Sequence, residues 1–229
     1  MHNNDELKYK MMEWGAAKVG YGDLKAVIPE EYKDLSTGIS FAIRLSDEII
    51  SQIKDKPTHT YFHHYRSVNA LIDQIALKGA IYLQSLGYLA MPIAASQSIN
   101  GEGRNFEGIF QHKTAATLAG IGWIGKSACL ITQEYGPRVR LGTLLTNMPV
   151  KFDQPIIASR CGNCTSCVDS CPANAIKGNH WTQSVAREEL FYAKVCSMHM
   201  HKQYQHIGRG SVCGICIKSC PQGTQVIKR

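Results

Sequence analysis

The spacing of the cysteines constrains this chain more than any other feature of its sequence. Cys161, Cys164, Cys167 and Cys171 form one run, and Pro172 follows it directly. In bacterial iron–sulfur sequences with this C-x2-C-x2-C-x3-C-P spacing, three cysteines hold one 4Fe–4S cluster and the fourth ligates a second cluster. A single run of this kind therefore predicts two clusters.

The last part of the chain supplies the ligands that the first run leaves open. Cys213, Cys216 and Cys220 repeat the two-residue and three-residue spacings. Cys196, displaced upstream, replaces the missing first cysteine. Cys129 is left over, and its apolar surroundings predict a buried core thiol rather than a nucleophile. The predicted ligand sets are Cys161, Cys164, Cys167 and Cys220 for one cluster, and Cys171, Cys196, Cys213 and Cys216 for the other.

Zinc and disulfides explain this cysteine pattern less well than clusters do. Zinc sites prefer two C-x2-C pairs separated by a spacer. Disulfides form in oxidising compartments, whereas residues 1–10 are polar and contain no apolar signal core. We therefore expect a cytoplasmic iron–sulfur protein in a well-reduced cell.

The length and the net charge of the chain limit the kinds of molecule that it is expected to bind. The chain has 229 residues, of which 44% are hydrophobic, and its apolar runs are far shorter than a membrane span. Its formal charge of +7 overstates the charge of the metal-loaded protein, because the cluster thiolates outweigh the positive charge of two oxidised clusters. The small remaining excess suits an acidic electron-donor protein or an anionic ligand, and no Lys/Arg block indicates nucleic-acid binding.

The pattern of apolar residues and turn signals predicts an α/β body before the cysteines. The expected helices lie at 6–17, after the capping residue Ser46, at 60–86 before Gly87, and at 111–119; the expected strands lie at 38–45, 88–94, 128–132 and 139–146. A polar loop at 96–108 is long enough to line a binding site. We expect an α/β domain at 1–158 and a cluster module at 159–229.

A glycine-rich turn at 120–127 (GIGWIGKS) satisfies two nucleotide-binding patterns. Both patterns require a strand before the turn and a helix after it, and here the predicted order is reversed. Nucleotide binding is therefore not expected. Gly122 and Gly125 can still expose backbone amides to a flat or phosphate-bearing ligand. The alternative is a tight helix-to-strand turn with Trp123 as a core anchor.

Residues 112–146 (HKTAATLAGIGWIGKSACLITQEYGPRVRLGTLLT), together with CGNCTSCVDSCPANAI and CGICIKSCP, closely resemble the catalytic core of epoxyqueuosine reductases, which are relatives of the respiratory reductive dehalogenases. The resemblance implies an α/β (α+β) fold with a nitroreductase-like, cobalamin-binding domain and a ferredoxin-like module that holds two 4Fe–4S clusters. It also implies that electrons pass from a ferredoxin-type or flavodoxin-type donor through the clusters to a cobalamin whose lower base is detached.

The resemblance also assigns residues to these groups. It implies a corrinoid site formed by Gly122, Trp123, Gly125, Lys126, Arg138 and Arg140. It further implies that the cluster held by the set containing Cys161 is the one nearer the cobalamin. The set containing Cys196 would then hold the outer cluster, which faces the electron donor.

Two departures from the family pattern change the expected substrate. Epoxyqueuosine reductases carry an aspartate, thought to be the proton donor, thirteen residues before the alanine that corresponds to Ala119, and Phe106 occupies that position here. The adjacent Glu107 is the substitute donor that we expect. Relatives also carry a helical-repeat domain after the cluster module that helps to hold tRNA, whereas this sequence ends at Arg229. We therefore expect a small-molecule substrate rather than tRNA.

Three functions remain open from the sequence. The first is a cobalamin-dependent iron–sulfur reductase, which the complete α/β segment favours. The second is an electron-transfer iron–sulfur protein without a corrinoid. The third is a cobalamin reductase or handling protein, which needs the clusters and the corrinoid site but no proton donor. Phe106 is compatible with the second and the third.

Overall fold

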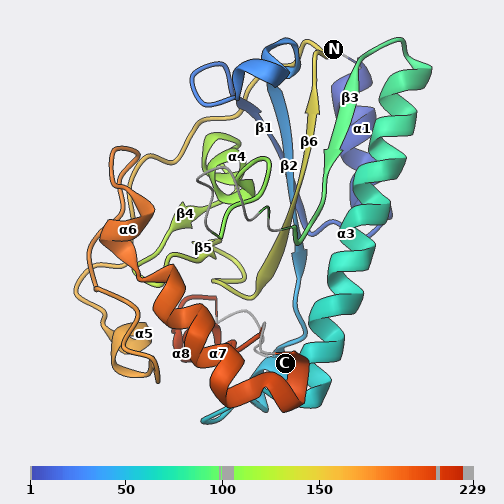
Figure 1. Ribbon diagram of the computed structural model, residues 1–229. Helices are drawn as coiled ribbons and strands as arrows, with labels where there is room; N and C mark the ends of the chain where they lie inside the picture. Colours follow the sequence, from blue (N-terminus) through green and yellow to red (C-terminus); the bar gives the residue numbers. More distant parts are fainter. Residues whose placement is uncertain (1, 98, 100–105, 210–211, 224–229) are drawn as a thin grey trace. The chain divides into compact units, whose positions relative to one another are not determined.

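The computed structural model describes residues 2–97, 99, 106–209 and 212–223 (Figure 1). The chain forms two compact units, and each unit is assembled from three separate segments. Unit 1 consists of Met1–Arg44, Val68–Gly122 and Arg140–Ile156, and unit 2 of Leu45–Ser67, Trp123–Val139 and Ile157–Arg229. The last division, after Ile156, lies close to the expected one at 158/159. The two earlier segments of unit 2 depart from the expected continuous domains.

Unit 1 is built on a four-stranded sheet with strand order β1-β2-β6-β3. The strands are β1 (Lys18–Asp23), β2 (Thr37–Arg44), β6 (Val139–Thr146) and β3 (Ala90–Ile93). Strand β1 is antiparallel to β2, with Lys18 opposite Ala42, and β3 is antiparallel to β6, with Ala90 opposite Thr146. Seven of the eight residues of β2 are buried, as its continuous apolar run predicts for a strand covered on both faces.

Helices cover both faces of this sheet (Figure 1). They are α1 (His2–Glu13), α3 (His59–Ser85), α4 (His112–Leu118) and the short 3-10 helix η1 (Glu30–Leu35). The end of α4 approaches β1 closely, because a Cβ at Gly20 would lie 2.2 Å from the carbonyl oxygen of Ala119. Helix α1 also contacts β1. The expected mixed α/β architecture is therefore confirmed.

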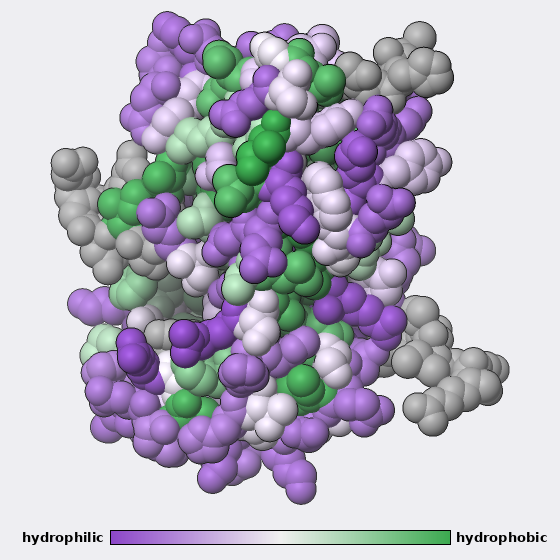
Figure 2. All heavy atoms as spheres, turned by 90° about the vertical axis from the view of Figure 1, so that its right-hand side faces the viewer, coloured by the Kyte–Doolittle hydropathy of each residue, from purple (hydrophilic) through white to green (hydrophobic). Residues whose placement is uncertain are grey.

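Most local predictions for unit 1 hold, with shifts at the ends of the elements. Strand β6 has the expected bounds, and Gly87 ends α3 with a φ of +85°. The first helix, expected at 6–17, begins at His2 and ends at Glu13. The apolar stripe of α3 is wider than its buried face: Leu77 and Ile81 are 54% and 57% exposed. Figure 2 shows hydrophobic patches among hydrophilic side chains on the face that carries this helix.

Unit 2 contains only short elements apart from one helix and the first turns of α3. They are α2 (Asp47–Ser51), β4 (Trp123–Ile124), β5 (Leu130–Ile131), α5 (Ser166–Asp169), α6 (Arg187–Leu190), α7 (Ala193–Gly208) and α8 (Ile215–Ser219). Ser46 caps α2 as predicted, since its Oγ accepts a hydrogen bond from the amide of Ile49 at 3.4 Å. The strand expected at 128–132 is reduced to β5, which pairs with β4.

The composition of unit 2 explains why it is assembled from three segments of the chain. Helices of four or five residues are not stable alone and have too little apolar surface to form a core. The segment 45–67 supplies that surface with the buried side chains of Ile53 and Tyr61, and α2 contacts α8. A Cβ at Gly214, immediately before α8, would lie 2.7 Å from the Tyr61 ring. Within the described ranges, no helix is both long and apolar enough to cross a membrane.

Candidate metal centre

Two similar helical turns in unit 2 carry six of the predicted ligands. Helix α5 contains Cys167, with Cys164 before it and Cys171 after it; α8 contains Cys216, with Cys213 before it and Cys220 after it. The two helices contact each other. Cys220, after α8, acts electrostatically on Cys167, and Cys171, after α5, acts on Cys213, which agrees with the crossing that the cysteine spacing predicts.

One group of neighbouring thiols comprises Cys161, Cys167 and Cys220. Burial raises the pKa of Cys167 to about 11, and the nearby Cys161 and Cys220 thiols raise it further because like charges repel. Burial also raises the pKa of Cys220 to about 11, with Cys161 again contributing. Three members of the first predicted ligand set therefore lie together.

The second group comprises Cys171, Cys196, Cys213 and Cys216. Burial raises the pKa of Cys196 to about 11, and the Cys213 and Cys171 thiols contribute. Burial likewise raises the pKa of Cys213, and the Cys171 thiol contributes to this shift. The Cys213 and Cys196 thiols both contribute to the raised pKa of Cys216. All four members of the second predicted set are thus close enough to act on one another electrostatically, while no three of the described His, Cys, Asp or Glu side chains are arranged to hold a single metal ion. The assignment of these groups as cluster ligands remains a prediction.

Cys164, the fourth member of the first set, is the most exposed of the predicted ligands. Its Sγ lies 3.4 Å from Oγ of Ser166, and this hydrogen bond lowers the pKa of the thiol. The backbone of Cys164 is held more firmly, because Nζ of Lys126 donates a hydrogen bond to its carbonyl oxygen at 3.0 Å. Lys126 is only 5% exposed.

Cys129 differs from the prediction. It is partly exposed rather than fully buried, and its side chain is hydrogen-bonded to Cys216. That hydrogen bond, together with burial, raises the pKa of Cys216. The Cys129 thiol also acts electrostatically on members of both groups, among them Cys167 and Cys196. The spacing of the other eight cysteines contains no signal for this contact, because Cys129 lies on a separate segment.

The glycine-rich turn is a helix-to-strand connection, with α4 before it and β4 after it. Gly125 packs tightly: a Cβ there would lie 2.3 Å from Cδ1 of Ile131 and 3.3 Å from Sγ of Cys161. The bare backbone at Gly125 thus accommodates a predicted cluster ligand. The two nucleotide-binding patterns lack the strand-before-helix order that they require.

Arg138 holds the other end of the first ligand set. Its Nη1 donates to the carbonyl oxygen of Gln222 at 3.0 Å, and its Nη2 donates to that of Cys220 at 3.5 Å. Its Nε lies 3.5 Å from Oδ1 of Asp47. The Arg138 side chain is buried. Through these contacts it links the segment around Cys220 to the segment that begins unit 2.

The remaining corrinoid candidates are divided between the units. Trp123 is 3% exposed, the guanidinium of Arg160 lies 5.5 Å from its ring centroid, and its indole Nε1 has no hydrogen-bond partner among the described residues. Gly122 and Arg140 belong to unit 1. There Arg140 Nε donates to Oδ1 of Asn69 at 3.0 Å.

The candidate proton donor lies at the edge of the described part of the long loop, of which residues 98 and 100–105 are outside the description. The carbonyl oxygen of Glu107 accepts a hydrogen bond from the amide of Ile99 at 2.8 Å, and the residue is half-buried. Phe106, in the position of the family's aspartate, has a φ of +56° and is 43% exposed. A bulky residue with positive φ is unusual and costs backbone strain.

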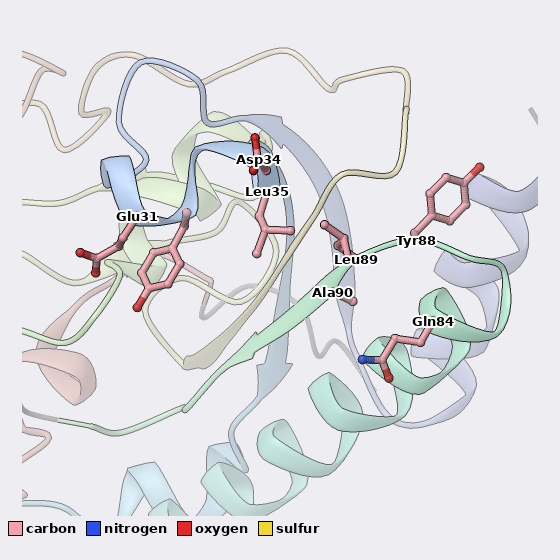
Figure 3. Close-up of a pocket in the computed structure, with 8 residues that line it drawn as sticks. Glu31, Asp34, Leu35, Gln84, Tyr88, Leu89 and Ala90 are labelled. Atoms are coloured by element: carbon pink, nitrogen blue, oxygen red, sulfur yellow. The ribbon is translucent and has the colours of Figure 1, made fainter.

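A surface cavity of about 350 Å³ lies in unit 1 (Figure 3). Glu31 and Asp34 line it from η1, Gln84 from the end of α3, Ala90 from the start of β3 and Leu89 from the position before that strand. The sequence gives no signal for this cavity. None of the predicted site residues lines it.

Comparison with known protein families supports the cluster prediction. The model of a 4Fe-4S double cluster binding domain matches residues 160–223. An epoxyqueuosine reductase of Bacillus anthracis is 45% identical over 69 residues, which are 30% of this chain and 18% of that protein. One from Lactococcus garvieae is 36% identical over 108 residues, covering 46% of this chain and 30% of that protein. These matches span less than a third of the relatives' own lengths.

Solved structures resemble the chain over almost its full length. A catabolic reductive dehalogenase in complex with 3-bromo-4-hydroxybenzoic acid has a TM-score of 0.72 at 20% identity, over 96% of this chain and 32% of its own. The epoxyqueuosine reductase from Streptococcus thermophilus has a TM-score of 0.62 at 20% identity, over 97% of this chain and 66% of its own. At these identities the likeness concerns the fold.

Proposed function

We propose, from the premise that the chain is an epoxyqueuosine reductase-like iron–sulfur oxidoreductase, that it passes electrons through two 4Fe–4S clusters to a base-off cobalamin for reductive chemistry on an unidentified substrate. The observation that carries this proposal is the meeting of seven predicted ligand thiols in two groups within unit 2.

The donor set fits the clusters. All the cysteines are free thiols. Burial raises the pKa of Cys167, Cys196, Cys213 and Cys220, so these four stay protonated in the apo-protein until iron binds. Lys126 and Arg138 hold the backbone carbonyls of Cys164 and Cys220 in the first set. Positive charges and hydrogen bonds beside cluster ligands stabilise the reduced, more negative cluster.

For cobalamin, the support comes from Trp123 and from the structural neighbours. The unpaired, buried Nε1 of Trp123 is a donor for a hydrogen-bond acceptor such as a corrinoid amide. One reductive dehalogenase neighbour is described as performing B12-dependent dehalogenation. Lys126 and Arg138 are already bonded to ligand segments, so we assign them first to the clusters. When bound, cobalamin would supply low-valent cobalt as the reductant of the substrate.

Glu107 is the proposed proton donor, and Phe106 supports a substrate other than that of the tRNA-modifying relatives. One epoxyqueuosine reductase neighbour has been solved with an epoxyqueuosine-modified tRNA stem loop. In our proposal the carboxyl group of Glu107 donates its proton to the reduced substrate, which we expect to be a small molecule. The electron donor would be a reduced ferredoxin or flavodoxin.

Iron analysis after anaerobic reconstitution tests the number of clusters. The wild-type protein should bind about eight iron atoms per chain. Cys220→Ala should impair one cluster and Cys216→Ala the other, so the two variants should lose different EPR signals. Cys129→Ala should keep both clusters. A wild-type content of about four iron atoms would contradict the two-cluster proposal.

EPR titration of the reconstituted protein with cob(II)alamin tests the acceptor. Loss of the splitting from the lower-base nitrogen would support base-off binding. The variant Trp123→Phe should bind the cobalamin more weakly. An unchanged spectrum would instead favour an electron carrier without a corrinoid. Once a substrate is found, Glu107→Gln separates the remaining functions: a reductase should lose turnover, whereas a cobalamin-handling protein should still reduce its cofactor.

A further inference from the structure

Helix α7 (Ala193–Gly208) carries a predicted cluster ligand behind an exposed apolar surface. Cys196 is half-buried and belongs to the second group of thiols. Beside it in the chain, Val195 is 43% exposed, Met198 is 62% exposed, and Tyr192 at the start of the helix is 51% exposed. These three residues form the apolar centre of what we call the α7 face.

The side of α7 opposite this face packs against other residues of unit 2. This packing decides which side chains of the helix stay exposed. Tyr204 and Ile207 are buried, and the Tyr204 hydroxyl donates to the carbonyl oxygen of Asp55 at 3.3 Å. A Cβ at Gly208 would lie 2.6 Å from the Phe62 ring. By helical periodicity, Lys194, Met198 and Lys202 share the side that points away from this packing.

The charged residues of helix α7 itself are of one sign. Helix α7 contains two lysines and three histidines but no aspartate or glutamate. Lys194 and Lys202 are exposed, and Nζ of Lys177 lies 4.1 Å from the Tyr192 ring centroid. Two exposed glutamates precede the helix: Glu188 is paired with Arg187, with 2.7 Å between Oε1 and Nη2, and Oε1 of Glu189 accepts a hydrogen bond from the amide of Ala186. The α7 face is therefore an apolar patch with a basic rim.

Such a surface suits a transient partner of opposite charge. Complementary charges speed encounter, while a small apolar centre allows a short-lived contact. We propose that the α7 face is the docking surface for an acidic one-electron donor protein, which reduces the cluster ligated by Cys196. This inference rests on the proposed function. In the transfer, the donor loses one electron, the oxidised cluster gains that electron, and no covalent bond forms or breaks.

Stopped-flow reduction of the reconstituted full chain by a photoreduced acidic plant-type ferredoxin tests the site. The double variant Lys194→Glu/Lys202→Glu should be reduced at least about tenfold more slowly than wild type at low salt. Salt should slow the wild type and not the variant. The matched control, Lys25→Glu/Lys151→Glu, changes the same charge at exposed positions in unit 1 and should react like wild type.

Dithionite, a small reductant that needs no docking surface, separates this inference from the proposed function. It should reduce the clusters equally in the wild type and in both variants. Equal rates with ferredoxin for wild type and the α7 variant, or equal slowing in the control, would overturn the docking site while leaving the clusters established. If dithionite finds no reducible cluster in the wild type, the proposed function fails, and the docking site fails with it.

Discussion

Lys126 and Cys164 are joined by a charge-assisted hydrogen bond, in which the lysine Nζ donates to the cysteine carbonyl oxygen at 3.0 Å. The lysine of a turn that matches the phosphate-binding pattern is therefore bonded to the loop of a predicted cluster ligand. Both residues belong to unit 2. The contact commits this buried lysine to the backbone of a predicted cluster ligand rather than to a nucleotide phosphate.

Replacing Lys126 by Met should weaken iron retention. The variant keeps the aliphatic stem but loses a hydrogen bond from a charged donor, worth about 1.5–3 kcal/mol. We expect roughly ten- to hundredfold weaker retention, measured by competition with an iron chelator under anaerobic conditions. The control Lys151→Met, at an exposed position in unit 1, should behave like wild type. Equal retention in both variants would show that the bond does not support the cluster.

Replacing Cys129 by Ala should lower the reduction potential of the cluster that Cys216 is predicted to ligate. Without metal, this hydrogen bond raises the pKa of Cys216, which therefore carries the proton. Once Cys216 is deprotonated as a ligand, only Cys129 can donate, and its hydrogen bond would stabilise the reduced cluster. Loss of about 0.5–1.5 kcal/mol corresponds to roughly 20–60 mV for one electron. An EPR-monitored redox titration measures the shift. Cys129→Ser, which retains a donor, should shift the potential less; a loss of iron in Cys129→Ala would identify Cys129 as a ligand instead.

Gly214 and Gly162 offer a matched pair for testing packing beside the ligands. Both have positive φ, at +80° and +54°, but only Gly214 is crowded, because a Cβ there would lie within 2.8 Å of both the Tyr61 ring and Ile53. Each substitution by Ala should cost about 1–2 kcal/mol for the left-handed backbone. Gly214→Ala should cost roughly a further 1–3 kcal/mol from overpacking. Urea unfolding of the two variants measures the difference, and equal losses would contradict the close packing.

His112 should make the stability of unit 1 depend on pH. Its Nε2 lies 3.0 Å from the carbonyl oxygen of Ala94, which can only accept, and its Nδ1 lies 2.8 Å from the hydroxyl oxygen of Thr143, which can donate to a neutral ring. Burial lowers the pKa of His112; the nearby Arg140 also lowers it, while the Ala94 hydrogen bond and Asp73 oppose the shift. The unfolded chain, with a pKa of about 6.5, then binds more protons than the folded one.

The contribution of His112 is therefore complete above the unfolded pKa and is lost as pH falls through the folded pKa. Anaerobic urea unfolding at about pH 5.5 and about pH 7.5 should give a smaller difference in His112→Gln than in wild type. The variant His59→Gln, at an exposed position, should retain the wild-type difference. An unchanged difference in His112→Gln would assign the acid sensitivity to other groups.

The sequence by itself determined the features that depend on neighbouring residues. The spacing of the cysteines predicted the iron–sulfur domain, because two- and three-residue spacings fix which thiols one turn can present. The Ser46 cap, the stop at Gly87 and the bounds of β6 follow equally from local conformational preferences. These predictions needed no knowledge of distant segments.

Only the tertiary structure decided what lies beside the predicted ligands. Lys126 contacts Cys164, Arg138 contacts Cys220, and Cys129 contacts Cys216 across long stretches of chain. The same is true of unit 2, where short ligand-bearing helices obtain their core from residues 45–67 and 123–139. Such contacts depend on which surfaces can be buried together, and burial is a property of the folded chain rather than of any local pattern.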